Sequence, residues 1–460
     1  MDSGGGTPAL ATPGAIFALV ITIIVFVLPI FIIFPPIPVE RSDVLRQTHS
    51  KLGIRPHKSN LRTQHSAVHE AQAGRPTTIQ SLFIYPIKSC RGIELSRATV
   101  LPTGLENDRI FALAQRKPTP GVDADVGAWE VLTQRQMPLM ANIKVDVWLP
   151  DSSKKSRQLG KVEEPFVLVR FPWADRGPRR LVQLLAAKLS RGLRAVPEKE
   201  FILPLNYPSA QDVAALGYKH DAVKIWKDTP SALNMERELP VELARYLGVR
   251  HRLAIFRMDP TRQREVFRCA PPKDSLGYQP IIDFHDAYPL HLLSLTSIRH
   301  LESNIKKDES IQRLDARRFR GNIIISGAEA YDEDDWKSVR FKGGACRGND
   351  ASSVFDVSCR TVRCKLPNVD QATGVRHRAE PDRAIRKYRE VDPGAPKMGC
   401  LGMQLCPVFP QSETPEQLQS MLEVGMEVDV LQRGPHHYYW TDQKGERPEA
   451  AQTEKAQHPP

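Results

Sequence analysis

A cysteine among basic residues offers one centre for chemistry in this sequence. Cys364 directly follows Arg363 at the end of an expected strand, with Arg360 and Lys365 close in the chain and Pro367 beyond. Positive neighbours favour the thiolate, so we expect a lowered pKa for this thiol. Because the thiolate is the form that ligates a metal, Cys364 is a candidate metal ligand. Taken alone, the segment leaves a buried, inert cysteine as the alternative.

Two other segments combine positive charge with hydrogen-bond donors. In YPIKSCRG, Lys88 and Ser89 lie where a strand is expected to give way to a turn, and a lysine beside a hydroxyl suits phosphate binding. An ordinary polar turn is the alternative. In RFRGN, Arg320 and Asn322 would share one face of a strand. A guanidinium fork beside an amide suits a phosphate and the edge of a heterocycle.

Other polar residues are weaker candidates for anion binding. Arg109 follows Asp108 at the start of an expected strand, where it either forms a structural ion pair or faces a phosphate. Ser294, Thr296 and Ser297 begin a helical pattern, so their hydroxyl and N–H groups are placed to bind an anion. Capping of that helix is an equal alternative.

The bulk composition limits the kind of protein. The 460 residues carry a formal net charge of +11, but the basic residues are scattered, without a block or an aromatic-interleaved stripe. A solvated basic surface is the simplest explanation of this charge, an anionic membrane surface or a phosphorylated cofactor is an alternative, and nucleic acid is disfavoured. The seven cysteines are widely spread and include no C-x-x-C pair. That pattern disfavours a disulfide framework, a structural zinc site and an iron–sulfur cluster, so electrons for any redox chemistry must come from another protein.

The N-terminal region contains one long apolar stretch. AIFALVITIIVFVLPIFIIF (15–34) has no charge and is long enough to cross a bilayer as a helix. We therefore expect a short tail at 1–14 and a single-pass transmembrane anchor at 15–34. A cleaved signal peptide is the alternative, but no basic residue precedes the stretch. The basic residues that follow it predict a cytosolic location for the C-terminal part.

The rest of the chain is typical of a mainly β protein with some α. We expect a flexible basic linker at 35–76 and a disordered tail at 435–460. Alternation of apolar and polar residues predicts strands, and short strands broken by Gly and Pro favour β-barrel architecture. The clearest expected strands are 79–87, 109–115, 143–149, 339–343 and 424–431. The expected helices are 176–190, 238–247, 296–306 and 380–390.

Three segments taken together resemble one family. IYPIKSCRGIEL (84–95), RFRGNIIISG (318–327) and TVRCKLPNVDQATG (361–374) are similar to signature segments of MOSC-domain proteins, in particular the mitochondrial amidoxime-reducing component. The resemblance extends over roughly 77–434. It implies an N-terminal β-barrel domain at 77–257 and a MOSC β-barrel domain at 258–434.

The resemblance also implies a cofactor and the residues that hold it. The cofactor is the molybdenum cofactor, with Cys364 as molybdenum ligand and catalytic residue. The implied cofactor-binding residues are Lys88, Ser89, Arg109, Ser297, Arg320, Asn322 and Arg363. Two positions depart from the family pattern: Val362 stands where the family often has Ser, and a cofactor-facing Tyr is replaced near Gln404. Both departures bear on substrate range more than on cofactor binding.

The activity implied by the resemblance is a two-electron reduction of N-hydroxylated substrates such as amidoximes and hydroxylamines. The expected electron donors are a b5-type cytochrome and its NADH-dependent reductase, and the expected location is the mitochondrial outer membrane. A sulfur transferase that carries a cysteine persulfide is an alternative, as is a cofactor-binding protein without turnover. Pyridoxal phosphate binding is a further family-level association, although no desulfurase domain with its Lys motif is apparent. His285 and Asp286 are candidates for proton delivery, but a structural role is favoured.

Overall fold

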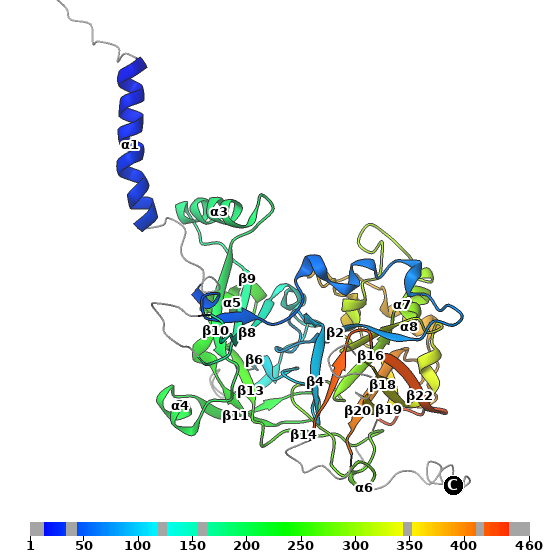
Figure 1. Ribbon diagram of the computed structural model, residues 1–460. Coiled ribbons are helices and arrows are strands. Elements are labelled where there is room, and N and C mark those ends of the chain that lie inside the picture. Colours follow the sequence, from blue (N-terminus) through cyan, green and yellow to red (C-terminus); the bar gives the residue numbers. More distant parts are fainter. Residues whose placement is uncertain are drawn as a thin grey trace, which may run out of the picture.

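Two β-rich parts make up most of the protein, with helices at their margins (Figure 1). This computed structural model describes residues 13–33, 44–117, 127–154, 163–343, 352–410 and 418–440, and the side chains of the first helix only as far as Val27. The prediction of a mainly β fold with some α is confirmed.

The first part combines a closed barrel with a four-stranded sheet. The barrel has the order β11-β12-β13-β6-β7, and the sheet has the order β1-β8-β9-β10. The barrel strands are β6 (Phe111–Lys117), β7 (Ala128–Val131), β11 (Lys219–Lys224), β12 (Ser231–Asn234) and β13 (Leu253–Met258). The sheet strands are β1 (His49–Lys51), β8 (Lys144–Pro150), β9 (Phe166–Pro172) and β10 (Glu198–Pro204).

The second part is a larger sheet that closes on itself. Its order is β17-β16-β20-β19-β18-β22-β2-β3, and β17 also pairs with β2, so seven of these strands form a ring. The strands are β2 (Thr78–Ile84), β3 (Ile93–Leu95), β16 (Leu290–Ser294), β17 (Ile323–Ser326), β18 (Trp336–Lys342), β19 (Ser352–Val362), β20 (Cys400–Val408) and β22 (Glu427–Arg433). The strands expected around 79–87, 109–115, 143–149, 339–343 and 424–431 are therefore all present, with shifted ends.

The expected division at residue 257/258 does not separate the two parts in space. β2 and β3 belong to the second ring, where Leu82 is paired with Ile323 of β17. β4 (Arg97–Leu101) likewise joins β5 (Gly104–Leu105) to β21 (Ser420–Glu423). The physical reason is pairing: the open side of the C-terminal ring is completed by hydrogen bonds from an N-terminal strand.

Short elements surround the barrels. The four expected helices appear as α3 (Pro178–Arg191), α5 (Val241–Leu247), α7 (Leu295–Ser303) and α8 (Asp382–Tyr388). Two further short helices are α4 (Ala210–Ala215) and α6 (Lys273–Leu276), and a small hairpin joins β14 (Arg264–Glu265) to β15 (Ile281–Ile282). The 3-10 turns are η1 (Pro56–Lys58), η2 (Asn60–Thr63), η3 (Ala67–His69), η5 (Pro138–Asn142), η6 (Glu236–Glu238), η7 (Ala316–Phe319), η8 (Asp332–Asp335) and η9 (Leu366–Asn368).

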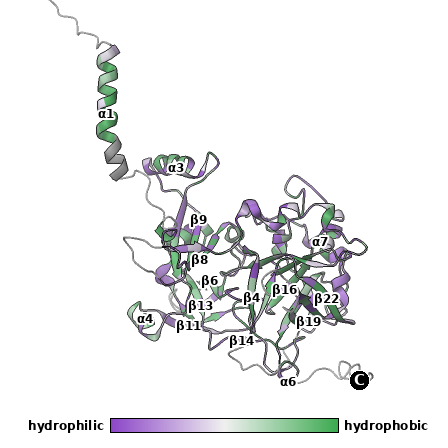
Figure 2. Ribbon diagram, in the orientation of Figure 1, coloured by the Kyte–Doolittle hydropathy of each residue, from purple (hydrophilic) through white to green (hydrophobic). Residues whose placement is uncertain are grey.

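The apolar N-terminal stretch forms the helix α1 (Pro13–Ile33). Figure 2 shows it as almost uniformly hydrophobic over the part that is coloured. Within the described part of the chain, however, no helix combines the length and the hydropathy that crossing a membrane requires. The predicted transmembrane span is thus not supported, and the side chains at 28–33 and all of 1–12 lie outside the described residues.

The prediction of a flexible linker at 35–76 is wrong for the residues that the structure describes. Residues 44–76 lie against the body: β1 pairs with β8, and Leu45, Leu61 and His69 are buried. Leu61 packs with the core that surrounds α7, which a solvated tether would not do. Residues 34–43 lie outside the described residues. The beginning of the expected tail is also ordered, since His436 and Tyr438 are buried, whereas 441–460 lies outside the described residues.

Candidate functional site

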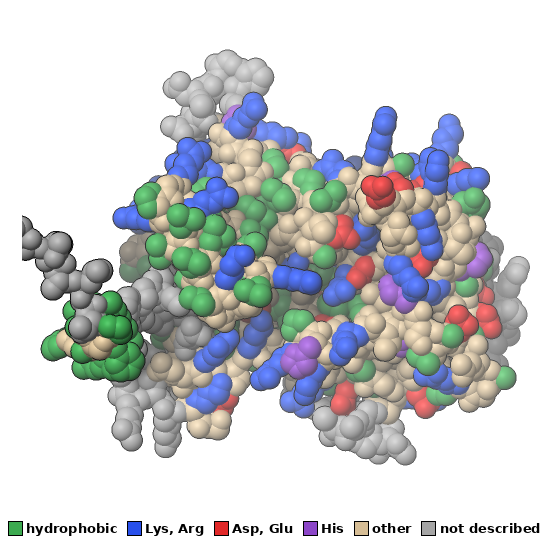
Figure 3. Space-filling model, turned by 90° about the horizontal axis from the view of Figure 1, so that it is seen from above, with side chains coloured by type: hydrophobic (Ala, Val, Ile, Leu, Met, Phe, Trp, Pro, Cys, Tyr) green, Lys and Arg blue, Asp and Glu red, His purple; other side chains and the backbone are tan. Residues whose placement is uncertain are grey.

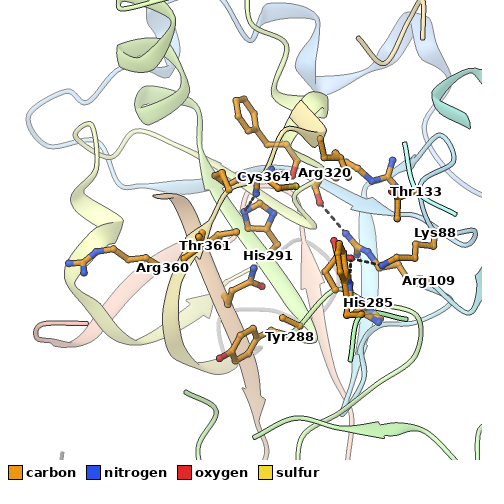
Figure 4. A pocket seen from close by; sticks show the side chains of 18 of the residues that line it. Lys88, Arg109, Thr133, His285, Tyr288, His291, Arg320, Arg360, Thr361 and Cys364 are labelled. Atoms are coloured by element: carbon orange, nitrogen blue, oxygen red, sulfur yellow. Dashed lines mark hydrogen bonds and ion pairs between the residues drawn. The ribbon is translucent and has the colours of Figure 1, made fainter. Parts of the chain in front are cut away.

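A cavity of about 540 Å³ lies where the two β parts meet. This volume is in the range of small-molecule and cofactor sites. Its lining residues include the turn after β2, the approach to β6, the segment before β16, the approach to β17, the end of β19 and the middle of β20 (Figure 4). Seven of the eight residues expected to form the site line it: Lys88, Ser89, Arg109, Arg320, Asn322, Arg363 and Cys364.

The cavity lining is strongly positive. Among the described lining residues, Asp286 is the one carboxylate, against eight basic side chains: Lys88, Arg109, Arg135, Lys227, Arg268, Arg320, Arg360 and Arg363. Several buried polar atoms of the lining have no hydrogen-bond partner in the described structure, namely Arg320 Nη2, Arg363 Nε, Thr361 Oγ1 and His285 Nδ1. Buried donors without partners are costly, so this lining suits an anionic ligand that would satisfy them.

Backbone strain is concentrated around the same cavity. Five lining residues other than glycine have a positive φ: Ser89 at 64°, Arg109 at 53°, Trp226 at 56°, Arg268 at 41° and Arg320 at 55°. Left-handed conformations cost free energy for residues with a Cβ, and they gather at ligand sites where the surroundings enforce them. For Arg320 this corrects the sequence interpretation, because it ends η7 and is not on a strand with Asn322.

The Asp108 carboxylate binds several of the residues that surround the cavity. It accepts hydrogen bonds from Tyr85 N at 2.6 Å, Asn322 Nδ2 at 2.8 Å and His285 Nε2 at 3.1 Å, and it forms an ion pair with Arg109. Burial by itself would raise the pKa of Asp108, but the Arg109 guanidinium and the other donors hold that pKa well below its usual range. Asp108 is therefore a buried carboxylate that fixes the direction of Arg109.

Burial lowers the pKa values of Lys88 and His285, and these shifts bear on the role of each residue. Burial lowers the pKa of the Lys88 ammonium to about 8, although its ion pair with Asp286 at 2.6 Å opposes that shift. Burial also lowers the pKa of His285 to about 4, against the raising effect of Asp108. His285 is consequently neutral at pH 7. A neutral imidazole that supports Asp108 fits the structural role more than proton donation.

Two arginines of the site stack on one aromatic ring. The guanidinium carbons of Arg109 and Arg320 lie 4.9 and 4.1 Å from the centroid of the Tyr85 ring. The Tyr85 hydroxyl donates to Gly321 O at 3.1 Å, and Arg320 donates to Cys90 O at 2.7 Å. The ring thus holds both positive side chains in place beside the cavity, and Nη2 of Arg320 has no partner in the described structure.

Arg363 and Cys364 lie directly beyond β19, as the sequence predicts. The pairing of β19 with β20 is irregular at Val357/Cys359 and again at Arg360/Val362. Such bulges change which face a strand end presents. Arg363 is buried and donates to Phe319 O at 3.0 Å, while its Nη1 lies 3.3 Å from His291 Nε2. Cys364 is half-buried and lines the cavity wall.

Two predicted residues differ from the expectation, since Ser297 lies outside the cavity lining and Asn322 lines the cavity but uses its amide within the protein. Ser297 is buried in α7, where its hydroxyl donates to Glu333 at 2.9 Å and accepts from Tyr331 N, and it does not line the cavity. The Asn322 amide is used within the protein, with Asp108 and Phe83 O as acceptors. Arg360 extends away from the central group in Figure 4 and donates to His436 O at 3.2 Å.

Sequence reasoning missed several lining residues. His291 stands on β16 opposite Gln404 of β20, and its burial, with Arg363 beside it, lowers its pKa well below the usual value. Trp226 lies under the Arg135 guanidinium at 4.2 Å, and Trp440 comes from the expected tail.

The described residues contain no group of three or more His, Cys, Asp or Glu side chains arranged to hold a metal ion. The lining does fit a metal that arrives with its own anionic organic ligand. Cys364 would add one thiolate, and the unpartnered atoms of Arg320, Arg363 and Thr361 would meet the anionic part. The donor set is therefore compatible with a phosphorylated pterin cofactor.

The site is a strained, positively charged cavity between two β-barrels, and Cys364 is the one thiol among the described residues of its wall. The chain belongs to the MOSC-domain family: residues 76–159 match the MOSC N-terminal beta barrel domain and residues 279–428 match the MOSC domain. Its relatives include proteins named mitochondrial amidoxime-reducing component and proteins named molybdenum cofactor sulfurase.

Among these relatives, the human mitochondrial amidoxime-reducing component 1 is 25% identical over 333 residues, which cover 70% of this chain and 74% of that protein. The mitochondrial amidoxime reducing component 2 of Rattus norvegicus is 22% identical over 75% of this chain and 80% of its own length. A molybdenum cofactor sulfurase of Oryza sativa subsp. japonica is 26% identical over 68% of this chain but only 31% of the sulfurase.

Proposed function

We propose that this protein binds the molybdenum cofactor and reduces N-hydroxylated compounds such as amidoximes and hydroxylamines, with Cys364 as the metal ligand. The observation that carries the proposal is the cavity, where an accessible thiol faces guanidinium groups with unpartnered nitrogens. When bound, the cofactor would supply two-electron chemistry at its metal.

The roles of the chain's own residues follow from their geometry. Arg320 and Arg363 would hold the anionic part of the cofactor, since each has a buried nitrogen without a partner in the described structure. Lys88, which lies across the cavity from Cys364 in Figure 4, would add a positive charge, and Ser89 in the same lining would add a hydroxyl. Asp108, Asn322 and Tyr85 are positioning residues that keep Arg109 and Arg320 oriented.

The overlap in length favours a reductase over a sulfurase. The aligned region covers about three quarters of the amidoxime-reducing components but about a third of the sulfurases. The sulfurases therefore contain a large additional region that this similarity does not reach. Sulfur transfer through a persulfide on Cys364 is the second candidate, supported by the same accessible thiol.

Electron supply and location are part of the proposal. A b5-type cytochrome with its NADH-dependent reductase would deliver the electrons. Mitochondrial location is supported by the names of the relatives. α1 exposes apolar side chains such as Ile16, Phe17 and Phe26, which supports attachment to a membrane, and we propose the mitochondrial outer membrane. Subcellular fractionation of the full chain, with and without residues 1–33, tests this part.

The central test is metal content. The full chain would be produced in a host that makes the molybdenum cofactor, then assayed for molybdenum, pterin and benzamidoxime reduction. Cys364→Ser should lose the activity and release the metal, whereas Cys269→Ser, which alters another partly exposed thiol outside the cavity lining, should keep both. A folded wild-type chain without molybdenum or pterin would refute the proposal. A persulfide on Cys364, together with absent reductase activity, would establish the sulfur-transfer alternative.

A further inference from the structure

The helix α3 (Pro178–Arg191) presents an apolar face that no described part of the protein covers. Leu181 is 66% exposed, Leu185 61% and Leu189 80%. Val182 in the helix is 53% exposed, and Leu193, just beyond the helix end, is 84% exposed, so both extend the same surface. Single exposed leucines are ordinary, but five large aliphatic side chains on one short segment are not.

The spacing of these residues shows that the exposure is not accidental. Leu181, Leu185 and Leu189 recur at intervals of four, so they lie in one row along the helix, with Val182 beside them. The opposite side of α3 attaches to the protein. There Ala187 is buried, and the side-chain amide of Gln183 donates to Asp175 at 3.0 Å. The helix is thus held by its other face, and the leucine row points outward.

Basic residues predominate around the row, and one of them, Arg191, forms an ion pair with Glu198 of β10 at 2.6 Å. Residues 176–196 contain six basic residues and neither Asp nor Glu: Arg176, Arg179, Arg180, Lys188, Arg191 and Arg194. Arg179 and Lys188 are exposed on the two flanks of the leucine row. Figure 3, which looks down on the face carrying α3, shows hydrophobic side chains there with Lys and Arg around them.

We propose that α3 is an interfacial helix that lies in the surface of an anionic lipid bilayer, with Leu181, Leu185 and Leu189 inserted among the lipids. An outward apolar row with basic flanks is the pattern of helices that lie in the plane of a membrane. The absence of carboxylates over 176–196 gives charge complementarity to anionic headgroups, which a generic protein partner or a second copy of this helix would not offer.

This contact is distinct from the cofactor site and from α1. α3 connects β9 to β10, two strands of the four-stranded sheet, and none of its residues lines the cavity. A second attachment would fix the orientation of the body at the membrane. One weak anchor is readily reversible, whereas two together give stable binding.

The test follows α3 separately from α1 by hydrogen–deuterium exchange of the full chain. The chain would be reconstituted with membranes of phosphatidylcholine alone or of phosphatidylcholine mixed with phosphatidylserine. Amides of 178–193 should exchange at least about tenfold more slowly in the anionic membranes, and added salt should weaken the effect. The amides of α5 (Val241–Leu247) serve as an internal reference.

The triple variant Leu181→Ser, Leu185→Ser, Leu189→Ser should abolish this protection, and because all three side chains are exposed it should fold normally. The control variant Leu216→Ser, at a half-exposed leucine outside α3, should leave the protection of the α3 amides intact. Equal exchange in both membranes would overturn the proposal. So would protection that grows with protein concentration in the absence of lipid, which would instead identify a second copy as the occupant.

Discussion

The side-chain amide of Asn322 donates to the carboxylate of Asp108 at 2.8 Å, across 214 positions of sequence. This hydrogen bond joins the approach to β17 with the approach to β6 and so connects the two β parts beneath the cavity. The side-chain oxygen of Asn322 accepts a hydrogen bond from His291 N at 3.2 Å. Asn322 therefore holds three segments of the site together.

Asn322→Ala should destabilise the fold by about 2–3 kcal/mol, because it leaves the buried Asp108 carboxylate and the His291 N–H each short of one partner. Chemical denaturation monitored by fluorescence would measure the loss. Asn206→Ala, at an exposed position, is the control and should change stability by less than about 0.5 kcal/mol. Equal effects of the two substitutions would show that the Asn322 network is not a structural connection.

Stability should decline on the acid side in part because of His285. Its folded-state pKa is about 4, below the usual 6.5, so the unfolded chain binds a proton that the folded chain does not. Stability from this group is therefore complete above about pH 6.5 and is lost as the pH falls towards 4. The full difference corresponds to about 3 kcal/mol.

His285→Gln tests this assignment, since the amide can still donate to Asp108 but cannot titrate. Denaturation curves between pH 4 and 7 should show a shallower loss of stability for the variant than for the wild type. His436, whose pKa burial also lowers to about 4, stays unchanged in both proteins and so cancels in the comparison. If the stability of the two proteins falls in parallel with pH, His285 is not the source of the acid destabilisation.

Arg320→Lys tests the role of a guanidinium fork in holding an anionic cofactor. The ammonium keeps the charge but loses the planar pair of donors, including the unpartnered Nη2. A charge-assisted hydrogen bond contributes about 1.5–3 kcal/mol, so cofactor release should be about tenfold faster or more. Pterin fluorescence after dilution would follow the release.

The matched control for Arg320→Lys is Arg317→Lys. Arg317 belongs to the same turn, but it is half-exposed, pairs with Asp315 and does not line the cavity. This variant should retain the cofactor as the wild type does. If both variants release the cofactor at the wild-type rate, Arg320 does not bind it.

Gln404→Tyr should alter substrate range and leave molybdenum content unchanged. Gln404 lines the cavity on β20 opposite His291, and a tyrosine there would narrow the space. We expect KM to rise several-fold for bulky amidoximes and to change little for small hydroxylamines, because only the larger substrates need that volume. Val362→Ser, at the other departure from the family pattern, is a comparison that changes polarity with less change of size.

Much of the local structure was predictable because it depends on neighbouring residues. The alternation along 79–87 and 143–149 is visible in the sequence, since one face of each strand must be apolar to be buried. The placement of Cys364 at a strand end and the gathering of three motif segments were also predictable. The position of Ser297 was not: a hydroxyl at a helix start looks the same in sequence whether it meets a ligand or Glu333.

The sequence by itself determined the five strands with the clearest alternation, most of the helices and the set of residues that provide charge and a thiol. Only the tertiary structure decided that β2 completes the C-terminal ring, that Asp108 orients Arg109, and that bulges in β19 turn its end toward the cavity. It also decided that residues 44–76 pack and that α3 does not bury its leucines. The physical reason is that periodicity specifies which face is apolar, whereas the surface that covers that face is chosen by contacts between distant segments.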